Sequence, residues 1–117
     1  MTQAFTKAKL SGSTNGRGIK VVATATAGTT IHTAVAGTSS LDEVWLWAQN
    51  NHTAAVDLTI EYGGVASPDD LIIMSIPSKS GLYLIVPGLV LQNSLVVKAF
   101  ASVANVVIVS GFVNGIV

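Results

Sequence analysis

Polar and apolar side chains alternate along residues 56–62, VDLTIEY, and two glycines then end the run. Successive side chains of a strand point to opposite faces, so this segment separates a polar side from an apolar side. The pattern predicts a half-buried β-strand with a turn after it. We expect Asp57 and Glu61 to lie on its solvent face.

Other segments are apolar on both faces, as in LIIMSIP (71–77) and NVVIVSGFV (105–113). Residues 43–50 show the same feature, with Val44, Leu46 and Ala48 on one face and Trp45 and Trp47 on the other. In a sandwich one face of each sheet packs inward and the other meets solvent. A monomer would therefore expose apolar side chains, which a contact between copies would bury.

Turn signals divide the chain into short extended segments, and no stretch keeps a helical apolar period against a charged face. β-branched residues are abundant, which favours strands. The expected strands are 4–10, 19–27, 31–36, 43–50, 56–62, 71–77, 82–88, 95–103 and 105–113. We predict an all-β fold, a single antiparallel β-sandwich of jelly-roll-like form with about eight short strands. The alternative is a small barrel with some exposed valines.

Three loop predictions accompany these strands. Residues 11–18, SGSTNGRG, form a polar loop, so that residues 1–18 are either an N-terminal arm or a first strand plus loop before the sandwich at 19–117. Pro87-Gly88 is a strong turn dipeptide. Ala104-Asn105 is placed to form a tight hairpin turn between the last two strands.

Composition narrows the class of protein. Of 117 residues, 50% are apolar and only 10% are charged, with a net charge of zero. A nucleic-acid binder would carry a basic excess, which is missing here. No apolar run is long enough for a membrane helix, and we expect no membrane partner. The chain has no cysteine and no visible signal peptide, so we expect it to be made in the cytoplasm.

A surface so poor in charge points to coverage by neighbours. We therefore expect an obligate homo-oligomer, a trimer around a central apolar axis. Trp45, Trp47, Met74 and Ile76 are the residues expected to serve as interface or core anchors.

Candidate chemistry is sparse. His32 and His52 lack the spacing of a metal-ligand set, and Asp69-Asp70 lacks a calcium-loop pattern. We predict no catalytic residue, no cofactor and no metal, with a cupin-like metal enzyme as the weak alternative. Trp45 and Trp47 lie two apart on one strand face, which also allows a platform that stacks sugars.

Residues 43–117 contain motifs that resemble a known family. The motifs begin with EVWLWAQNNHTAAVDLTIEYGG at residues 43–64. The short motifs Ile-Pro, Leu-x-Leu, Pro-Gly-Leu, Ala-Asn-Val and Gly-Phe then follow in this order across residues 76–112. This order resembles small β-sandwich virion proteins of tailed bacteriophages, including capsid decoration (cement) proteins and domains of head and tail fibres. The resemblance covers residues 19–117 and implies no catalytic residue.

Several expectations follow from that resemblance. Such a protein would be assembled in the host cytoplasm, sit on the exterior of the capsid, and bind the major capsid protein as an oligomer. Within Thr2 to Leu10, we expect Lys7 and Lys9 to meet an acidic capsid surface and Phe5 to be an apolar anchor. The alternative for this segment is the first strand of the sandwich. The alternative function is a receptor- or glycan-binding sandwich of a tail or head fibre.

Overall fold

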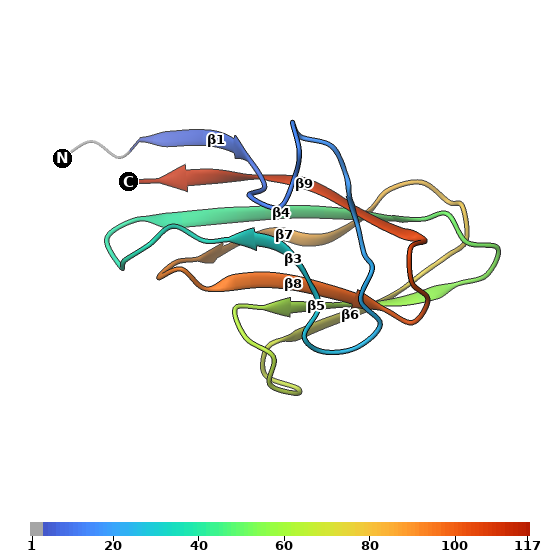
Figure 1. Cartoon of the computed structure of the whole chain (residues 1–117). Coiled ribbons are helices and arrows are strands. Elements are labelled where there is room, and N and C mark those ends of the chain that lie inside the picture. The colour runs from blue at the N-terminus through green and yellow to red at the C-terminus, as the bar shows by residue number, and fades with distance from the viewer. Residues whose placement is uncertain (1–3) are drawn as a thin grey trace.

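The computed structural model describes residues 4–117, which form nine strands in two antiparallel sheets (Figure 1). In order across sheet A lie β1 (Phe5–Lys9), β9 (Val107–Ile116), β4 (Leu41–Asn50) and β7 (Tyr83–Leu91). The two-residue β2 (Ile19–Lys20) also pairs with β9. In order across sheet B lie β3 (Thr29–Thr33), β8 (Val96–Ala101), β5 (Val56–Tyr62) and β6 (Leu71–Ile76).

The pairing of the strands is nested. Apart from short β2, the first strand pairs with the last, β3 with β8, β4 with β7, and β5 with β6. This is the order of one long hairpin wrapped into two sheets, the jelly roll. The described residues contain no α-helix. The predicted antiparallel β-sandwich is therefore confirmed.

The core lies between the sheets and is almost wholly aliphatic. The inward side chains of β4 show how it is built, because Val44, Leu46 and Ala48 are fully buried. Asp42 and Asn50, at the two ends of this inward row, are also buried but polar. Strand β4 thus places an apolar centre between two polar ends.

Both polar ends of β4 bind the opposite sheet. The Asp42 carboxylate lies 2.7 Å from Nε2 of His32 on β3. At the other end, Nδ2 of Asn50 donates to the carbonyls of Ile76 on β6 and of Ala54, each at 2.9 Å. Buried polar groups need such partners to offset the loss of water. The two sheets are therefore joined by directional bonds where the apolar core ends.

The strand predicted over 19–27 is wrong after Lys20. Val21 bonds to the backbone of Val107 in sheet A, while the carbonyl of Ala23 accepts from Ala101 in sheet B. The segment therefore crosses from one sheet edge to the other, which a continuous strand in one sheet cannot do.

Both predicted turns also need correction. Pro87-Gly88 does not end a strand, because β7 continues to Leu91 with register shifts against β4 on either side. β7 is an edge strand, where a proline is tolerated. Ala104-Asn105 lies in a turn, yet β8 and β9 belong to different sheets and do not pair. In both cases, pairing with strands distant in sequence decides whether the dipeptide forms a hairpin turn.

The solvent-face prediction is correct for Asp57 and wrong for Glu61. Asp57 is exposed, but Glu61 is only 1% exposed. The segment before β3 covers it, and the Glu61 carboxylate accepts hydrogen bonds from the Thr26 hydroxyl and from the Gly28 backbone N–H, the latter at 2.6 Å. A buried carboxylate therefore holds this crossing segment against the outer side of sheet B.

Removal of the Asn50 side chain tests the polar ends of β4. We expect Asn50→Ala to lower the free energy of unfolding by about 1–3 kcal/mol, because it leaves the buried Ile76 carbonyl without its donor. Gln49→Ala, on the outward face of the same strand, should change it by less than about 0.5 kcal/mol. Equal losses in urea unfolding would contradict this assignment.

Candidate interaction surface

An aromatic cluster lies on the outer side of sheet A. The ring centroids of Trp45 and Trp47 are 6.2 Å apart, and those of Trp45 and Phe112 are 6.3 Å apart. Trp47 and Phe112 are separated by 6.0 Å, and all three ring planes lie within 28° of one another. The three side chains are half-buried. Together they form a nearly parallel aromatic group across β4 and β9.

The backbone beneath Trp45 allows the indole to lie close to the sheet. A Cβ atom on Gly88 of β7 would stand 2.8 Å from Cζ2 of Trp45, so only glycine leaves room there. On the other side, a Cβ on Gly111 of β9 would stand 1.9 Å from the Trp45 carbonyl oxygen. Two glycines on flanking strands thus set the position of this tryptophan.

Glu43 orients the same indole. Nε1 of Trp45 donates to Oε1 of Glu43 at 2.7 Å, and Nδ2 of Asn114 donates to that oxygen at 3.1 Å. These bonds favour the charged carboxylate, so they hold the pKa of Glu43 below its usual 4.5. The indole N–H therefore has a charged acceptor within the surface itself.

Leu84 and Val90 extend the cluster over β7. Leu84 pairs with Trp47 and Val90 pairs with Glu43, so both lie on the outer side of the sheet. They are 45% and 51% exposed. We call the outer surface formed by Trp45, Trp47, Phe112, Leu84 and Val90 the aromatic face.

Strand β1 borders this face. All five of its residues are exposed, and its backbone pairs antiparallel with β9. Lys7 reaches across to Phe112, with Nζ 4.2 Å from the ring centroid, which is a cation–π distance. Phe5 and Lys9 pair with Ile116 and Phe112 and so share the same outer side. The predicted capsid-contact residues therefore lie together, on the first strand of the sandwich.

The four predicted anchors do not lie together. Trp45 and Trp47 are on the outer face of sheet A, whereas Ile76 is fully buried in the core and Met74 packs against it. Met74 and Ile76 are thus core residues of sheet B. Phe112 joins the two tryptophans although the sequence did not single it out. The sequence does place Phe112 on one face of a strand that is apolar on both faces, and this position could have indicated that it lies on the outer surface.

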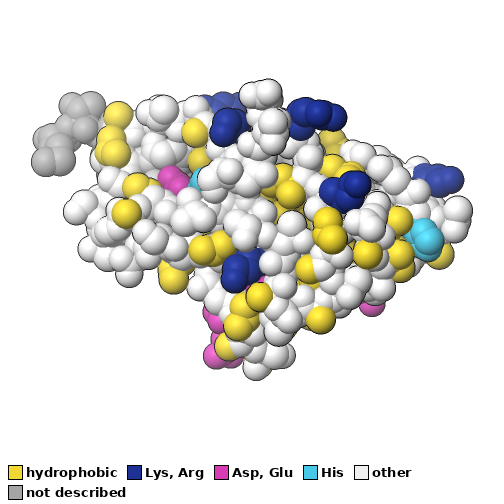
Figure 2. All heavy atoms as spheres, in the orientation of Figure 1, with side chains coloured by type: hydrophobic (Ala, Val, Ile, Leu, Met, Phe, Trp, Pro, Cys, Tyr) yellow, Lys and Arg dark blue, Asp and Glu magenta, His cyan; other side chains and the backbone are white. Residues whose placement is uncertain are grey.

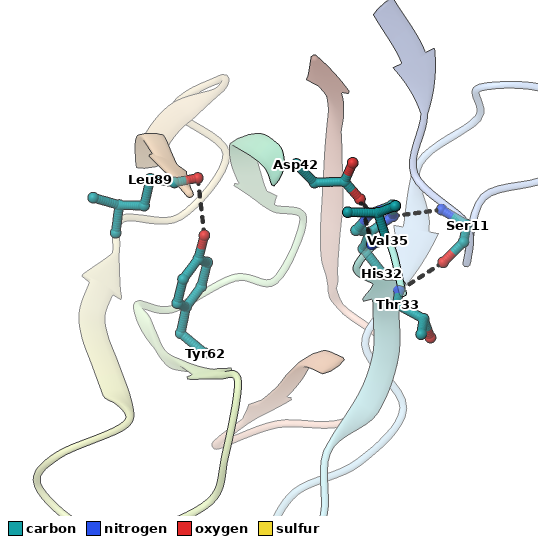
Figure 3. Close-up of polar contacts among 7 residues, drawn as sticks. All are labelled: Ser11, His32, Thr33, Val35, Asp42, Tyr62 and Leu89. Atoms are coloured by element: carbon teal, nitrogen blue, oxygen red, sulfur yellow. Dashed lines mark hydrogen bonds and ion pairs between the residues drawn. The ribbon is translucent and has the colours of Figure 1, made fainter. Parts of the chain in front are cut away.

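Apart from the aromatic face, a polar cluster surrounds His32 (Figure 3). Its Nδ1 accepts the backbone N–H of Ser11 at 2.9 Å, so Nε2 carries the hydrogen and donates to Asp42. Asp42 also accepts from the Val35 N–H at 3.1 Å. The Ser11 hydroxyl accepts from Thr33 N–H at 2.7 Å and does not bond to the imidazole. Ser11, His32 and Asp42 therefore link the loop before β2 to β3 and β4. The Ser11 hydroxyl forms no hydrogen bond with a ring nitrogen of His32, as a nucleophilic serine would.

Tyr62 forms another link between the sheets. Its hydroxyl donates to the Leu89 carbonyl of β7 at 2.9 Å, which Figure 3 shows beside the His32 cluster. Burial raises the pKa of Tyr62 above its usual 10, and the charge of Asp42 raises it further. The tyrosine is thus held neutral as a hydrogen-bond donor between β5 and β7.

The described residues offer few sites for other ligands. Within 4–117, no three His, Cys, Asp or Glu side chains gather closely enough to hold a metal ion. No pocket opens in the surface that these residues form. His52 and Asp69 lie in separate loops, and Asp70 accepts from the Ala66 N–H at 3.1 Å, a turn-stabilising contact. The aromatic face is therefore the candidate site.

Comparison with known proteins identifies no relative: no protein-family model, no curated protein and no solved structure matches this chain. Residues 4–117 contain no helix long and apolar enough to cross a membrane. The aromatic face and the sequence therefore provide the basis for a functional assignment.

The lowered pKa of Glu43 predicts an acid-dependent contribution to stability. A depressed carboxylate stabilises the fold above its unfolded pKa, near 4.5, and that contribution is lost as pH falls through the lower folded value. We expect Glu43→Gln to lower the melting temperature at neutral pH, with a difference from the wild type that shrinks below pH 4.5. Melting curves across this range, with Gln49→Ala as control, check it. A difference that stays constant with pH would contradict it.

Proposed function

We propose that this protein is a non-enzymatic virion structural protein that binds the assembled capsid as an oligomeric decoration, or cement, protein. The observation that carries the proposal is the aromatic face, an apolar surface on the outer side of sheet A. Tryptophan is enriched at the centres of protein interfaces. A surface with this composition favours a protein partner over solvent.

The energetics support association. Burial of apolar surface contributes about 25 cal/mol per Å². Phe5, Leu84 and Val90 are 67%, 45% and 51% exposed, so a partner can still cover much of each side chain. A few such residues are sufficient for several kcal/mol of binding free energy, before the cost of association is subtracted.

Stabilisation of the capsid would follow from selective binding to its assembled form. A protein that binds only the assembled lattice stabilises that lattice by mass action, in the same way as any ligand of a folded state. An oligomer that holds several capsid subunits at once gains further from effective concentration. Weak individual contacts of a charge-poor surface are then sufficient, and no reaction chemistry is needed.

Strand β1 supports a role in capsid contact. Phe5, Lys7 and Lys9 are exposed on one side of the strand, at the rim of the aromatic face. An apolar anchor followed along the strand by two cations suits an acidic surface with an apolar recess. Thr2 and Gln3, which belong to the expected contact segment, lie outside the described residues.

A glycan-binding fibre domain is the second candidate. It is favoured by the nearly parallel rings of Trp45, Trp47 and Phe112, which resemble a stacking platform. Two contacts reduce the ring area available to a sugar, because Lys7 covers Phe112 and Trp45 lies over Gly88. We therefore place the capsid role first.

Copy number in purified virions tests the proposed function. Quantitative mass spectrometry should find the protein in a fixed ratio to the major capsid protein, as lattice-wide binding requires. A few copies per particle would instead place it in a tail or fibre. Absence from virions would overturn the proposal.

Tryptophan quenching by iodide separates the two candidates. Both tryptophans are half-buried in the single chain, so we expect partial quenching that falls when the protein binds capsids. Protection by free oligosaccharides, with none by capsids, would favour the glycan platform. Trp47→Ala should then abolish sugar binding, with Gln49→Ala as the control on the same strand face.

A further inference from the structure

Strand β6 forms an edge of sheet B and carries no charge. Its sequence, LIIMSI at residues 71–76, contains no Asp, Glu, Lys, Arg or Pro. All of its residues pair with β5 in one continuous register, and its other side has no neighbouring strand. In the middle of the strand, Ile73 is 63% exposed. A regular, apolar edge of this kind is a template for the addition of another strand.

Both edges of sheet A are protected from such pairing by the composition of their strands. On one edge, β1 carries Lys7 and Lys9, and lysine on an edge strand opposes pairing. On the other edge, β7 contains Pro87, which has no N–H to donate. The register of β7 against β4 also shifts on both sides of this proline, and such irregularities interrupt an edge ladder. Neither edge of sheet A is therefore a good template for another strand.

The β3 edge of sheet B is protected by the loop before β2. The Gly12 N–H donates to the Ile31 carbonyl of β3 at 2.9 Å. The Ser11 hydroxyl accepts from the Thr33 N–H of the same strand at 2.7 Å. Backbone groups of β3 that face away from the sheet are thus already bonded. Among the sheet edges that residues 4–117 form, β6 alone has no lysine, proline or register shift and no loop bonded along it.

The alternation of the β5–β6 ladder shows which backbone groups of β6 are free. The Tyr62 N–H donates to the Asp70 carbonyl at 2.8 Å, one step beyond the paired residues. Hydrogen-bonded pairs recur at every second residue of an antiparallel ladder, so the backbone of every second residue from Ile72 onward faces β5. The N–H and C=O groups of Ile73 and Ser75 therefore face away from β5. Within residues 4–117, no hydrogen bond engages these groups.

We propose that β6 of one copy pairs antiparallel with β6 of a second copy, so that the two B sheets join into one continuous sheet. With the two-fold axis at Ile73, the Ile73 N–H donates to the carbonyl of the partner's Ile73. The Ser75 N–H donates to the carbonyl of the partner's Leu71, and the symmetry repeats both bonds. The Leu71 N–H needs no partner, because it donates to the Pro68 carbonyl of its own chain at 3.3 Å. The edge is thus complementary to itself at each free N–H.

The exposed side chains of this edge suit a second copy of the chain. Strand alternation places Leu71, Ile73 and Ser75 on the outer side of sheet B. At the two-fold axis, the two Ile73 side chains are neighbours and cover apolar surface that a monomer exposes. Figure 2 shows hydrophobic side chains along the lower edge of the molecule, where β6 lies in Figure 1. A strand of the same composition brings no charge into this contact.

The two ends of β6 carry opposite charges, which favours antiparallel pairing with a second copy. Asp69 lies just before β6 and is exposed, and Lys79 lies just after it and is exposed. The Lys79 N–H donates to the Asn50 carbonyl, and Nδ2 of Asn50 donates to the Ile76 carbonyl. The backbone of Lys79 is therefore held near the last residue of β6. Antiparallel pairing brings the acidic end of each strand toward the basic end of the other.

The contact is two-fold and therefore closed, because it uses the β6 edge of both copies. It gives a dimer in place of the trimer expected from the sequence. The aromatic face and β1 belong to sheet A and stay uncovered. The inference thus goes beyond the proposed function and does not depend on it. A dimer with two aromatic faces would bind a lattice at two points and gain from effective concentration.

Molar mass from light scattering after gel filtration tests the contact. We expect the wild type to have twice the mass of the 12.0 kDa chain. Ile73→Lys should fall to 12.0 kDa, because it would set two lysines side by side on the joined edge. Ser75→Pro should also fall, because proline removes an N–H that bonds only to the partner. Val22→Lys, at an exposed valine outside β6, should keep the wild-type mass.

A single introduced cysteine tests the register, since the chain has none of its own. Under mild oxidation, Ile73→Cys should form a disulfide-linked dimer, because the two residues at position 73 face each other within disulfide range. Ser75→Cys should not, because the two residues at position 75 lie about 14 Å apart along the paired strands. Electrophoresis without reductant separates the linked dimer from the single chain.

Circular dichroism verifies that each variant is folded, and Ile73→Lys decides alone if Ser75→Pro is unfolded, because Ile73 is exposed in the single chain. Three results would overturn the inference: a wild-type mass of 12.0 kDa at the highest soluble concentration, an oligomer whose mass is unchanged in Ile73→Lys, or Ser75→Cys that cross-links as readily as Ile73→Cys. Virion copy number is measured independently. A monomer found in fixed ratio to the capsid protein would overturn this contact and leave the capsid role standing.

Discussion

The burial of β4 between polar ends is the constraint on which the rest of the fold depends. Its inward row runs from Asp42 through three aliphatic residues to Asn50, and every member is buried. A buried carboxylate and a buried amide are costly without partners. Asp42 has His32, and Asn50 has the carbonyls of Ile76 and Ala54. Sheet B must therefore lie where it supplies those partners, which sets how the two sheets align.

The same strand determines the candidate site. Because the inward positions of β4 are committed to the core, the alternation of the strand places Trp45 and Trp47 outside. β9 does the same with Phe112, and antiparallel pairing sets it opposite Trp45. Gly88 and Gly111 then allow the close approach of neighbouring backbone. The aromatic face is thus a consequence of the register that the core sets.

Several polar residues that are buried or half-buried connect parts of the structure. Glu61 holds the crossing segment through Thr26 and Gly28, and Tyr62 reaches the carbonyl of Leu89. His32 uses both ring nitrogens in structural bonds. Because these buried polar groups are committed to structural bonds, the proposed function is one of binding through the aromatic face.

The sequence by itself determined most of the strands and the two-sided character of several of them, because alternation with period two is a local property of the chain. It also divided the side chains of β4 into the two faces that the structure has. The turn signals and the lack of a helical period indicated the class of fold. Tertiary structure alone decided the rest. Whether β8 and β9 pair, whether Pro87 ends a strand, and whether a segment covers Glu61 depend on contacts between residues far apart in sequence. The gathering of Trp45, Trp47 and Phe112 into one face likewise needed the register between β4 and β9, which no local pattern encodes.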